Sequence, residues 1–548
     1  MKKTLLMIAC LGVFAISKGQ FVKEYYKGTN PDTRFSAIIP VSDAPNSNLY
    51  IVGNYGSQLV VAETKQSGAI LWSRRIIVND PDYTVNSLIR DSDGNLVFCG
   101  GISTGVDDNS NGFVIKFNPL TYTLVWFHKT TALVSFFDVA EIGAGGNYAI
   151  CGQEESNGTG NAADHIVMTC DRTTGSLSLI SNLNQHINET AQTLVVDPAG
   201  PSIYTSGRYE LNIGASKFRV CLTKMDVTGT VDFTKFSVKS LASTGRFYTE
   251  DMIIDGDNIL MAGSGDDAGT STFRYLFFYK TDLSGNLEWV KKYDITTTAS
   301  DGIICSIKKH DTGYILYGVL NNETETNIFL INVDFDGNIN WSKTYPYRKK
   351  QNPSGYYATS SLAVIGDHIF HVGEKLQEDG SIRGILMATT IETGDVGSCD
   401  EDLNTVMTTL VAPYEDDFTL QNATFTPSFL ATSAVIKDQI FTTEVTCTNV
   451  LEREGSENQV GLLVEDYMLN IYPNPTHGII SIEILNYVNN DDQFQVNILD
   501  LLGRIVYQND KYKLGENIDL TMITKGTYFI EVKDAQNNLS FGESIVIK

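Results

Sequence analysis

The chain has 548 residues, of which 42% are hydrophobic and 10% aromatic, and its formal net charge is −25. This length predicts two or more domains. The strong negative charge argues against a nucleic-acid partner, whose phosphates require clustered Lys and Arg, and against binding to an anionic membrane surface. The many aromatic residues and glycines, with short apolar runs between them, predict an all-β protein.

The N-terminus has the form of a secretory signal peptide. Lys2 and Lys3 precede an apolar run from Thr4 to Ile16, which is too short to span a bilayer. Ser17 and Gly19 are small residues at positions −3 and −1 of a cleavage site before Gln20. We therefore expect residues 1–19 to be removed and the mature protein to have no membrane span.

A repeat occupies the middle of the chain. Seven short apolar strands, such as LYIVGN and LVFCGG, each run into a glycine, and these units recur roughly every 50 residues. After the glycine come a polar loop, a second apolar strand, a turn such as LSGN, and a strand with an aromatic near its start, such as LEWVKKY. One further strand precedes the glycine strand, and four short strands per unit are typical of a β-propeller blade. The repeat glycines are Gly53, Gly100, Gly152, Gly207, Gly263, Gly318 and Gly373.

The seventh unit lacks a fourth strand, which the N-terminus can supply. The segment QFVKEYY at residues 20–26 is similar to EWVKKY and places Phe21 in the position of Trp72 and Trp289. We therefore predict that residues 20–398 form a seven-bladed β-propeller, closed by the N-terminal strand so that no edge stays open. The aromatic residues at this position are expected to pack between neighbouring blades, and stacking on sugars is the alternative.

The innermost strands predict a polar ring around the propeller axis. Aligned with one another, they give one column of small or polar residues between apolar columns: Ser36, Asn86, Asp138, Gln192, Asp251, Cys305 and Ser360. A water-filled channel explains such a column. Alternatively the ring binds a ligand, in which case Asp138 and Asp251 favour a cation or a hydroxyl-rich sugar. The candidate ligand-binding residues are Asn86, Asp138, Gln192, Asp251 and Ser360.

Cysteines and acidic residues limit the cofactors. Of eight cysteines, Cys10 lies in the signal peptide and no pair has the spacing of a zinc site, so no dedicated metal site is predicted. Cys399 and Cys447 lie outside the repeats and are predicted to form a disulfide, which an exported protein can hold. The remaining five are expected to be reduced and buried in strands. The loops after the repeat glycines are acidic, which makes them either a solvated surface or a site for Ca²⁺ or a basic partner.

Two regions follow the repeat. The segment 399–460 is rich in Thr and acidic residues, and its end, EREGSENQ, is free of apolar residues. We expect a Thr-rich segment of no assigned role followed by a linker. After it, LNIYPNPTHGIISIEI, LDLLGR and KGTY occur in that order.

This C-terminal region resembles the type A sorting domain of cargo of the type IX secretion system of Bacteroidetes. The matching residues are Tyr472, Pro473, Asn474, Pro475, Gly478, Asp500, Gly503, Arg504, Lys525, Gly526, Thr527 and Tyr528. The resemblance implies that residues 468–548 form a small β-sandwich that the type IX machinery handles. It also implies export, removal of this domain, and either release or attachment to the outer cell surface.

The sequence gives little support for catalysis. Neither His-Glu-x-x-His nor a P-loop occurs, and no catalytic residue is predicted. The propeller fold and the predicted export favour a binding or adhesion module for an extracellular glycan or protein. Two alternatives stay open. The first is a secreted polysaccharide hydrolase or lyase, with Asp138 and Asp251 as an acid/base pair, and the second is a structural surface protein.

Overall fold

A computed structural model describes most of the chain as two compact units, residues 1–451 and 452–548, and each is treated by itself here. The predicted signal peptide, residues 1–19, lies outside the described residues. None of the described segments forms a helix that could cross a membrane. The described residues are 20–26, 32–77, 83–103, 110–155, 163–183, 189–210, 218–237, 246–266, 275–295, 301–321, 326–347, 360–377, 379–396, 400–402, 405–409, 416–417, 429–431, 435–438, 441–448, 468–472, 476, 478–485, 493–500, 504–534 and 540–547.

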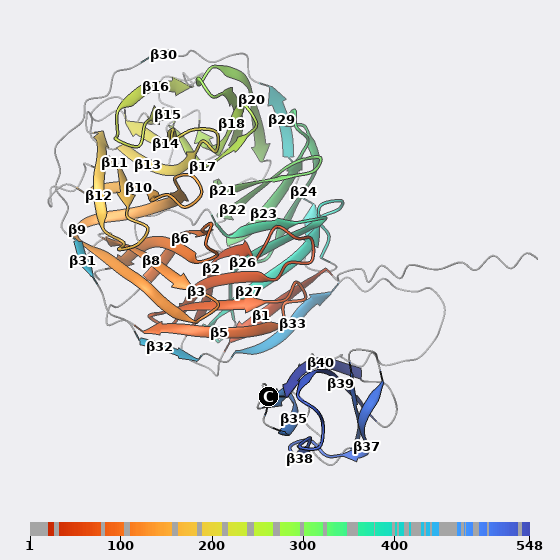
Figure 1. The fold of residues 1–548 in the computed structure, drawn as a ribbon. Coiled ribbons are helices and arrows are strands. Elements are labelled where there is room, and N and C mark those ends of the chain that lie inside the picture. Colours follow the sequence, from red (N-terminus) through yellow and green to blue (C-terminus); the bar gives the residue numbers. More distant parts are fainter. Residues whose placement is uncertain are drawn as a thin grey trace, which may run out of the picture. The chain divides into compact units, whose positions relative to one another are not determined.

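Within the described residues, strands β1 to β27 of the first unit fall into seven antiparallel groups of four, which we call blades 1 to 7 (Figure 1). The long strand β9 gives its first part to blade 2 and its second part to blade 3. Blade 1 contains β2 (Thr33–Pro40), β3 (Leu49–Tyr55), β4 (Gln58–Thr64) and β5 (Ile70–Ile77). Blade 2 contains β6 (Tyr83–Arg90), β7 (Leu96–Ser103), β8 (Ser110–Asn118) and the first part of β9 (Thr123–Glu141). Blade 3 contains the second part of β9, β10 (Tyr148–Glu155), β11 (Ala163–Cys170) and β12 (Leu177–Leu183). Blade 4 contains β13 (Glu189–Val196), β14 (Ile203–Glu210), β15 (Phe218–Met225) and β16 (Val231–Ser237), and blade 5 contains β17 (Arg246–Asp255), β18 (Asn258–Asp266), β19 (Tyr275–Asp282) and β20 (Leu287–Ile295). Blade 6 contains β21 (Asp301–His310), β22 (Gly313–Asn321), β23 (Thr326–Val333) and β24 (Ile339–Tyr345). Blade 7 contains β25 (Leu362–Ile365), β26 (His368–Leu376), β27 (Ile382–Thr390) and β1 (Phe21–Tyr26).

The blades close into a ring, so the unit is a β-propeller. The inner strands β2, β6, β9, β13, β17, β21 and β25 contact one another in this order, and β25 also contacts β2 (Figure 1). Buried apolar clusters lie between adjacent blades; one of them, for example, joins Val61 of blade 1 to Phe98 of blade 2. The all-β propeller predicted from the repeat is therefore confirmed.

The repeat glycines have a steric reason. A bulge in each of the first six inner strands brings its backbone close to the second strand of the blade, as at Val85/Ser87 opposite Gly100. A Cβ at Gly100 would lie 1.8 Å from the carbonyl oxygen of Thr84, which no larger residue can tolerate. The same clash, at 2.3 Å or less, would arise at Gly53, Gly152, Gly207, Gly263 and Gly318.

The repeated aromatic residues pack between blades, as the sequence predicts. Each faces a turn glycine of the next blade: a Cβ at Gly394, for instance, would lie 2.7 Å from the ring of Trp341. Blade 2 is the exception, because Tyr122 takes the place of the glycine with a φ of 57°. Its ring packs edge-on against Trp72, with centroids 5.0 Å apart.

The N-terminal strand β1 is held on both sides. It pairs with β27 in blade 7 and, on its other edge, with β33 (Thr442–Thr448). Phe21, Val22 and Tyr25 are buried, and the buried Glu24 accepts from Lys375 at 2.7 Å and from Arg383 at 2.8 Å. The strand thus occupies the fourth place of the last blade.

The segment after the propeller forms a belt around it. Six short strands each add a fifth strand to the outer edge of a blade, and they meet β24, β20, β16, β9, β5 and β1 in that order. The belt therefore runs round the ring against the order of the blades (Figure 1). Its strands are β28 (Glu401–Asp402), β29 (Thr405–Thr409), β30 (Asp416–Asp417), β31 (Phe429–Ala431), β32 (Val435–Asp438) and β33. The part of this segment up to residue 448 is thus built into the propeller.

Five of the cysteines are buried in strands, as expected: Cys99, Cys151, Cys170, Cys221 and Cys305. Cys399 lies outside the described residues. The backbone of Cys447 pairs with Val22 in β33, and its side chain is not described. The Cys399–Cys447 disulfide stays a prediction.

The second unit consists of two sheets around one core. The first sheet contains β34 (Met468–Tyr472), β35 (Ile479–Leu485) and β38 (Asn517–Asp519), and the second contains β36 (Phe494–Leu499), β37 (Ile505–Tyr512), β39 (Gly526–Asp534) and β40 (Ser540–Ile547). Ile480 and Ile482 of the first sheet pack in one buried cluster with Val496 and Ile530 of the second. This is the predicted small β-sandwich.

Candidate functional site

The inner strands place the predicted polar ring in two columns instead of one. In the strand pairing, Asn86 and Gln192 are bulged residues without a partner, whereas Asp138 pairs with Cys151 and Asp251 with Ala262. The two acids therefore lie one position beyond Asn86 and Gln192. Their column is Ala37, Ser87, Asp138, Thr193, Asp251, Ser306 and Ser361, and the bulge column is Ser36, Asn86, Phe137, Gln192, Glu250, Cys305 and Ser360.

Asp138 connects three blades. Its Oδ1 accepts from the Ser87 hydroxyl at 2.7 Å and from its neighbour's backbone N–H, and its Oδ2 accepts from Thr193 Oγ1 at 3.1 Å and Leu194 N at 3.0 Å. Burial raises the pKa of Asp138 to about 6, although these hydrogen bonds oppose the shift. Both oxygens are thus engaged by the protein itself.

Asp251 makes the corresponding contacts between blades 5 and 6. Its Oδ2 accepts from Ser306 Oγ at 3.0 Å and from Ile307 N at 2.7 Å, and its Oδ1 accepts from Met252 N at 2.8 Å. Burial raises the pKa of Asp251, while the charge of Lys308 lowers it. The geometry gives both acids a role in fastening neighbouring inner strands, and no hydrogen bond joins one acid to the other as an acid/base pair.

Of the other predicted ligand-binding residues, Asn86 bonds to the protein itself, whereas Ser360 lies at a cavity on the axis. The Asn86 amide donates to Phe136 O at 2.6 Å, in the next blade. Gln192 is buried, and its Oε1 has no hydrogen-bond partner in the described residues. Ser360 Oγ accepts from Leu88 N at 3.0 Å, and Ser360 lines a cavity on the axis.

This axial cavity lies where the inner strands end, and its volume is about 270 Å³. Four inner strands, from blades 1, 2, 6 and 7, supply its walls. The walls are mostly apolar, with two lysines and one serine: Ile38, Ile39, Pro40, Leu88, Lys308, Lys309, Ser360, Leu362, Ala363 and Val364. A largely apolar cavity with few polar groups is the usual form of a small-molecule site.

Lys308 interrupts an otherwise apolar column beside this cavity. Two positions beyond the column of Asp138, the other inner strands carry only aliphatic residues, which we call the collar. The collar consists of Ile39, Ile89, Ala140, Val195, Ile253 and Ala363. Lys308, at the same position of β21, is partly buried. A single ammonium group among six aliphatic side chains marks this place on the ring.

The neighbouring cations are paired, and Lys308 is not. Lys309 Nζ lies 2.5 Å from Asp255 Oδ1, and Arg90 donates to Val41 O at 2.6 Å. No hydrogen bond or ion pair of Lys308 occurs with any described residue. Lys308 is thus the cation of the cavity wall that is available to a ligand.

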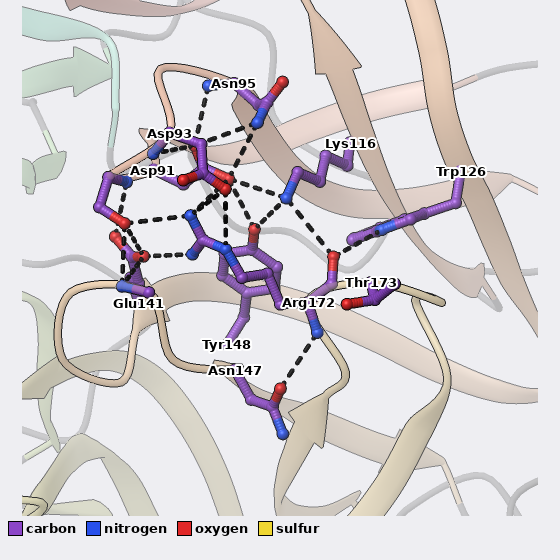
Figure 2. A network of polar contacts seen from close by, with 12 residues as sticks. Asp91, Asp93, Asn95, Lys116, Trp126, Glu141, Asn147, Tyr148, Arg172 and Thr173 are labelled. Atoms are coloured by element: carbon purple, nitrogen blue, oxygen red, sulfur yellow. Dashed lines mark hydrogen bonds and ion pairs between the residues drawn. The ribbon is translucent and has the colours of Figure 1, made fainter.

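A second polar cluster, near the same ends of the inner strands, holds blades 2 and 3 together (Figure 2). The buried Asp91 accepts from Tyr148 OH at 2.7 Å and lies 3.0 Å from Lys116 Nζ. Arg172 reaches Asp93 at 2.7 Å and also contacts Glu141.

Figure 2 also shows that this cluster is closed within the protein, because every charged side chain in it has a partner. Burial raises the pKa of Asp91, but the hydrogen bonds from Tyr148 and Lys116 outweigh it and hold the pKa below its usual value. A carboxylate satisfied in this way stabilises the contact between the blades. We therefore regard the cluster as structural.

The opposite ends of the blades carry acids in a different setting. Glu154 and Asp164 face each other across β10 and β11, and burial, together with the charge of Asp164, raises the pKa of Glu154 to about 7. Glu374 pairs with Arg34 at 3.2 Å. In the part of the chain that the structure describes, no three His, Cys, Asp or Glu side chains are grouped to hold a metal ion.

The sorting residues lie in the second unit as far as they are described. Gly478 adopts a φ of 118°, and a Cβ there would lie 2.8 Å from Thr521. Tyr528 OH donates to Thr524 O at 2.7 Å, and Arg504 forms an ion pair with Asp500 at 2.6 Å. Tyr472 ends β34 and Gly526 begins β39. Pro473, Asn474, Pro475 and Gly503 lie outside the described residues.

Comparison with known proteins identifies the C-terminal region. The family of secretion system C-terminal sorting domains matches residues 470–548. The predicted resemblance is confirmed, and the protein is exported by the type IX system to the cell surface or the medium, with removal of this domain. No curated protein matches the chain.

Solved structures show only remote similarity. An α-L-arabinofuranosidase from Fusarium graminearum is 11% identical with a TM-score of 0.39, and the match covers 58% of this chain and 97% of that one. An α-L-arabinanase from Penicillium chrysogenum is 10% identical with a TM-score of 0.38, covering 58% and 95%. The extracellular domain of a putative one component system from B. thetaiotaomicron is 12% identical with a TM-score of 0.26, covering 95% and 88%. All three TM-scores lie below 0.5, so none of these proteins informs the substrate of this chain.

Proposed function

We propose that this exported protein is a binding module, and that its ligand enters the propeller at the axial cavity. The observation that carries the proposal is the cavity itself, about 270 Å³ in volume and lined by inner strands of four blades. Strands that are fastened to their neighbours form a preorganised site, which lowers the entropic cost of binding.

The size and lining of the cavity favour a compact ligand. Its volume of about 270 Å³ lies just below the range for small-molecule pockets, roughly 300–1,000 Å³. The sequence predicted a glycan or a protein as ligand. Walls of Ile, Leu, Ala and Val suit an apolar body better than a hydroxyl-rich chain, so we propose a small molecule for this cavity.

A cavity-filling variant tests the site. The secreted protein is screened by thermal shift against a library of small organic acids, alcohols, amines and sugars. Ile39→Trp fills the cavity, whereas Ile253→Trp is the matched control, because it changes the same register position on a strand that does not line the cavity.

At least one compound should raise the melting temperature of the unmodified protein and of Ile253→Trp, but not of Ile39→Trp. A library without any such compound would contradict the proposal. So would a compound that stabilises Ile39→Trp as much as the unmodified protein, since binding would then lie elsewhere.

A further inference from the structure

We infer that the ligand of the axial cavity carries one anionic group, which binds the ammonium group of Lys308 while an apolar body lies against aliphatic residues of the cavity wall such as Ile39 and Leu88. This inference rests on the proposed function and adds the chemical class of the ligand. A short-chain carboxylic acid is the simplest molecule with these two parts.

The position of Lys308 is the first argument. Lys308 lies in a column that is aliphatic on the six other inner strands. A lysine there does not provide the packing that an aliphatic residue gives, and its long side chain can carry the charge to the cavity. A charged side chain at a position where packing favours an aliphatic one is consistent with ligand binding.

The absence of a partner is the second argument. Arg90 and Lys309 at the same end of the cavity bind protein acceptors, whereas Lys308 has no hydrogen bond or ion pair among the described residues. Asp251 is within electrostatic reach of Lys308, but its oxygens already accept from Ser306, Ile307 and Met252. The three donors of the ammonium group therefore remain for a ligand.

The charge of the wall is the third argument. The chain as a whole has a net charge of −25, yet no Asp or Glu lines the cavity and two lysines do. Asp255 neutralises Lys309, so Lys308 is the wall cation that can attract an anion in preference to a cation or a neutral molecule. This reverses the charge preference that the sequence predicted from Asp138 and Asp251.

Three probes of equal length separate the head group from the body: hexanoate, 1-hexanol and hexylammonium. Calorimetric titration of the secreted protein should show hexanoate binding about tenfold or more tightly than hexanol, which is the effect of one charge-assisted hydrogen bond. Lys308→Met should abolish this difference and leave the affinity for hexanol within about twofold. Lys65→Met, at an exposed turn, is the control for the change in net charge.

The outcomes separate the ligand class from the site. If hexanol binds as tightly as hexanoate, or hexylammonium binds best, and Ile39→Trp blocks that binding, the cavity stands and the anionic class is wrong. If none of the probes binds, the inference is wrong, whereas the library screen decides the cavity separately. If Lys308→Met lowers the melting temperature but binds hexanoate unchanged, Lys308 serves only as counter-charge to Asp251, and the inference is wrong.

Discussion

The inner strands and the belt fasten the same ring in different ways. Inner strands are joined by side chains, as where Asp138 accepts from Ser87 and Thr193 of the flanking blades. Belt strands are joined to the blades by backbone pairing, as where β29 runs antiparallel to β20. Side-chain contacts depend on particular residues, whereas backbone pairing tolerates many sequences. The difference teaches that the site should be sensitive to single substitutions and the belt to loss of whole strands.

The largest effect should come from removing β1, because this strand touches both regions. Deletion of residues 20–26 strips Phe21, Val22 and Tyr25 from the core, opens one edge of β27 and removes the strand with which β33 pairs. Loss of one buried aromatic alone costs about 3–5 kcal/mol. The deletion should therefore unfold the propeller, as followed by circular dichroism. An unchanged melting temperature would show that the ring does not need this strand.

Loss of the predicted disulfide in the belt segment should have the next largest effect on stability. The predicted Cys399–Cys447 disulfide would close a loop of about fifty residues, worth roughly 4 kcal/mol on the chain-entropy model. Its two thiols would lose two protons and two electrons to the disulfide of a thiol oxidase, which is reduced to a dithiol. Belt strands β28 and β33 lie on the neighbouring blades 6 and 7.

Non-reducing peptide mapping should show this single linked pair, and Cys447→Ser should melt earlier than the unmodified protein. Reduction with dithiothreitol is the control and should lower the unmodified protein to the same melting temperature. Mapping that finds Cys447 as a free thiol would refute the bridge.

Inside the ring, Asp138 should give a pH dependence. Its pKa is raised from 3.8 to about 6 in the folded protein. A raised carboxyl pKa means that the stabilisation is complete below about pH 4 and is lost as the pH rises through 6. The advantage of the unmodified protein over Asp138→Asn should therefore shrink by up to about 3 kcal/mol between pH 4 and pH 7.

Urea unfolding at the two pH values measures this change, with Asp311→Asn at an exposed turn as the control. A difference between the unmodified protein and Asp138→Asn that does not vary with pH would contradict the assigned pKa.

A last pair of substitutions compares the two regions directly. Phe35 of inner strand β2 is buried, and Phe441 of the belt is half-buried, with ring centroids 5.9 Å apart. Phe35→Ala should cost about 3–5 kcal/mol and Phe441→Ala about 1–2 kcal/mol, because Phe441 buries less surface. Denaturant unfolding of both variants gives the ratio. Equal losses would mean that the belt contributes to the core as much as the inner strands do.

The sequence predicted what recurs or carries a motif. Repeat glycines, inter-blade aromatics, the N-terminal strand and the sorting domain were all visible, because each is set by steric or packing needs at a fixed spacing. The bulge was not visible, because no fixed residue type marks the extra residue of an inner strand. Asp138 and Asp251 were therefore assigned to the column of Asn86 and Gln192, one position away from their own, and the collar that Lys308 interrupts was missed.

The belt could not be predicted for a related reason. Its strands are two to seven residues long and pair through the backbone at the blade edges. The Thr-rich composition of β29 and β33 fits an edge strand as well as a loop, and the other four strands are only two to four residues long. Alignment of the inner strands in the observed register would have shown Lys308 as the one charged residue in an otherwise aliphatic column.

The axial cavity is the central claim, and the most direct test is a crystal structure of the secreted protein soaked with hexanoate. We predict density for the acid within the cavity, with a carboxylate oxygen within about 3 Å of Lys308 Nζ and the chain against Ile39 and Leu88. A crystal structure that shows hexanoate bound elsewhere, or no hexanoate in the cavity after soaking at millimolar concentration, would contradict the account.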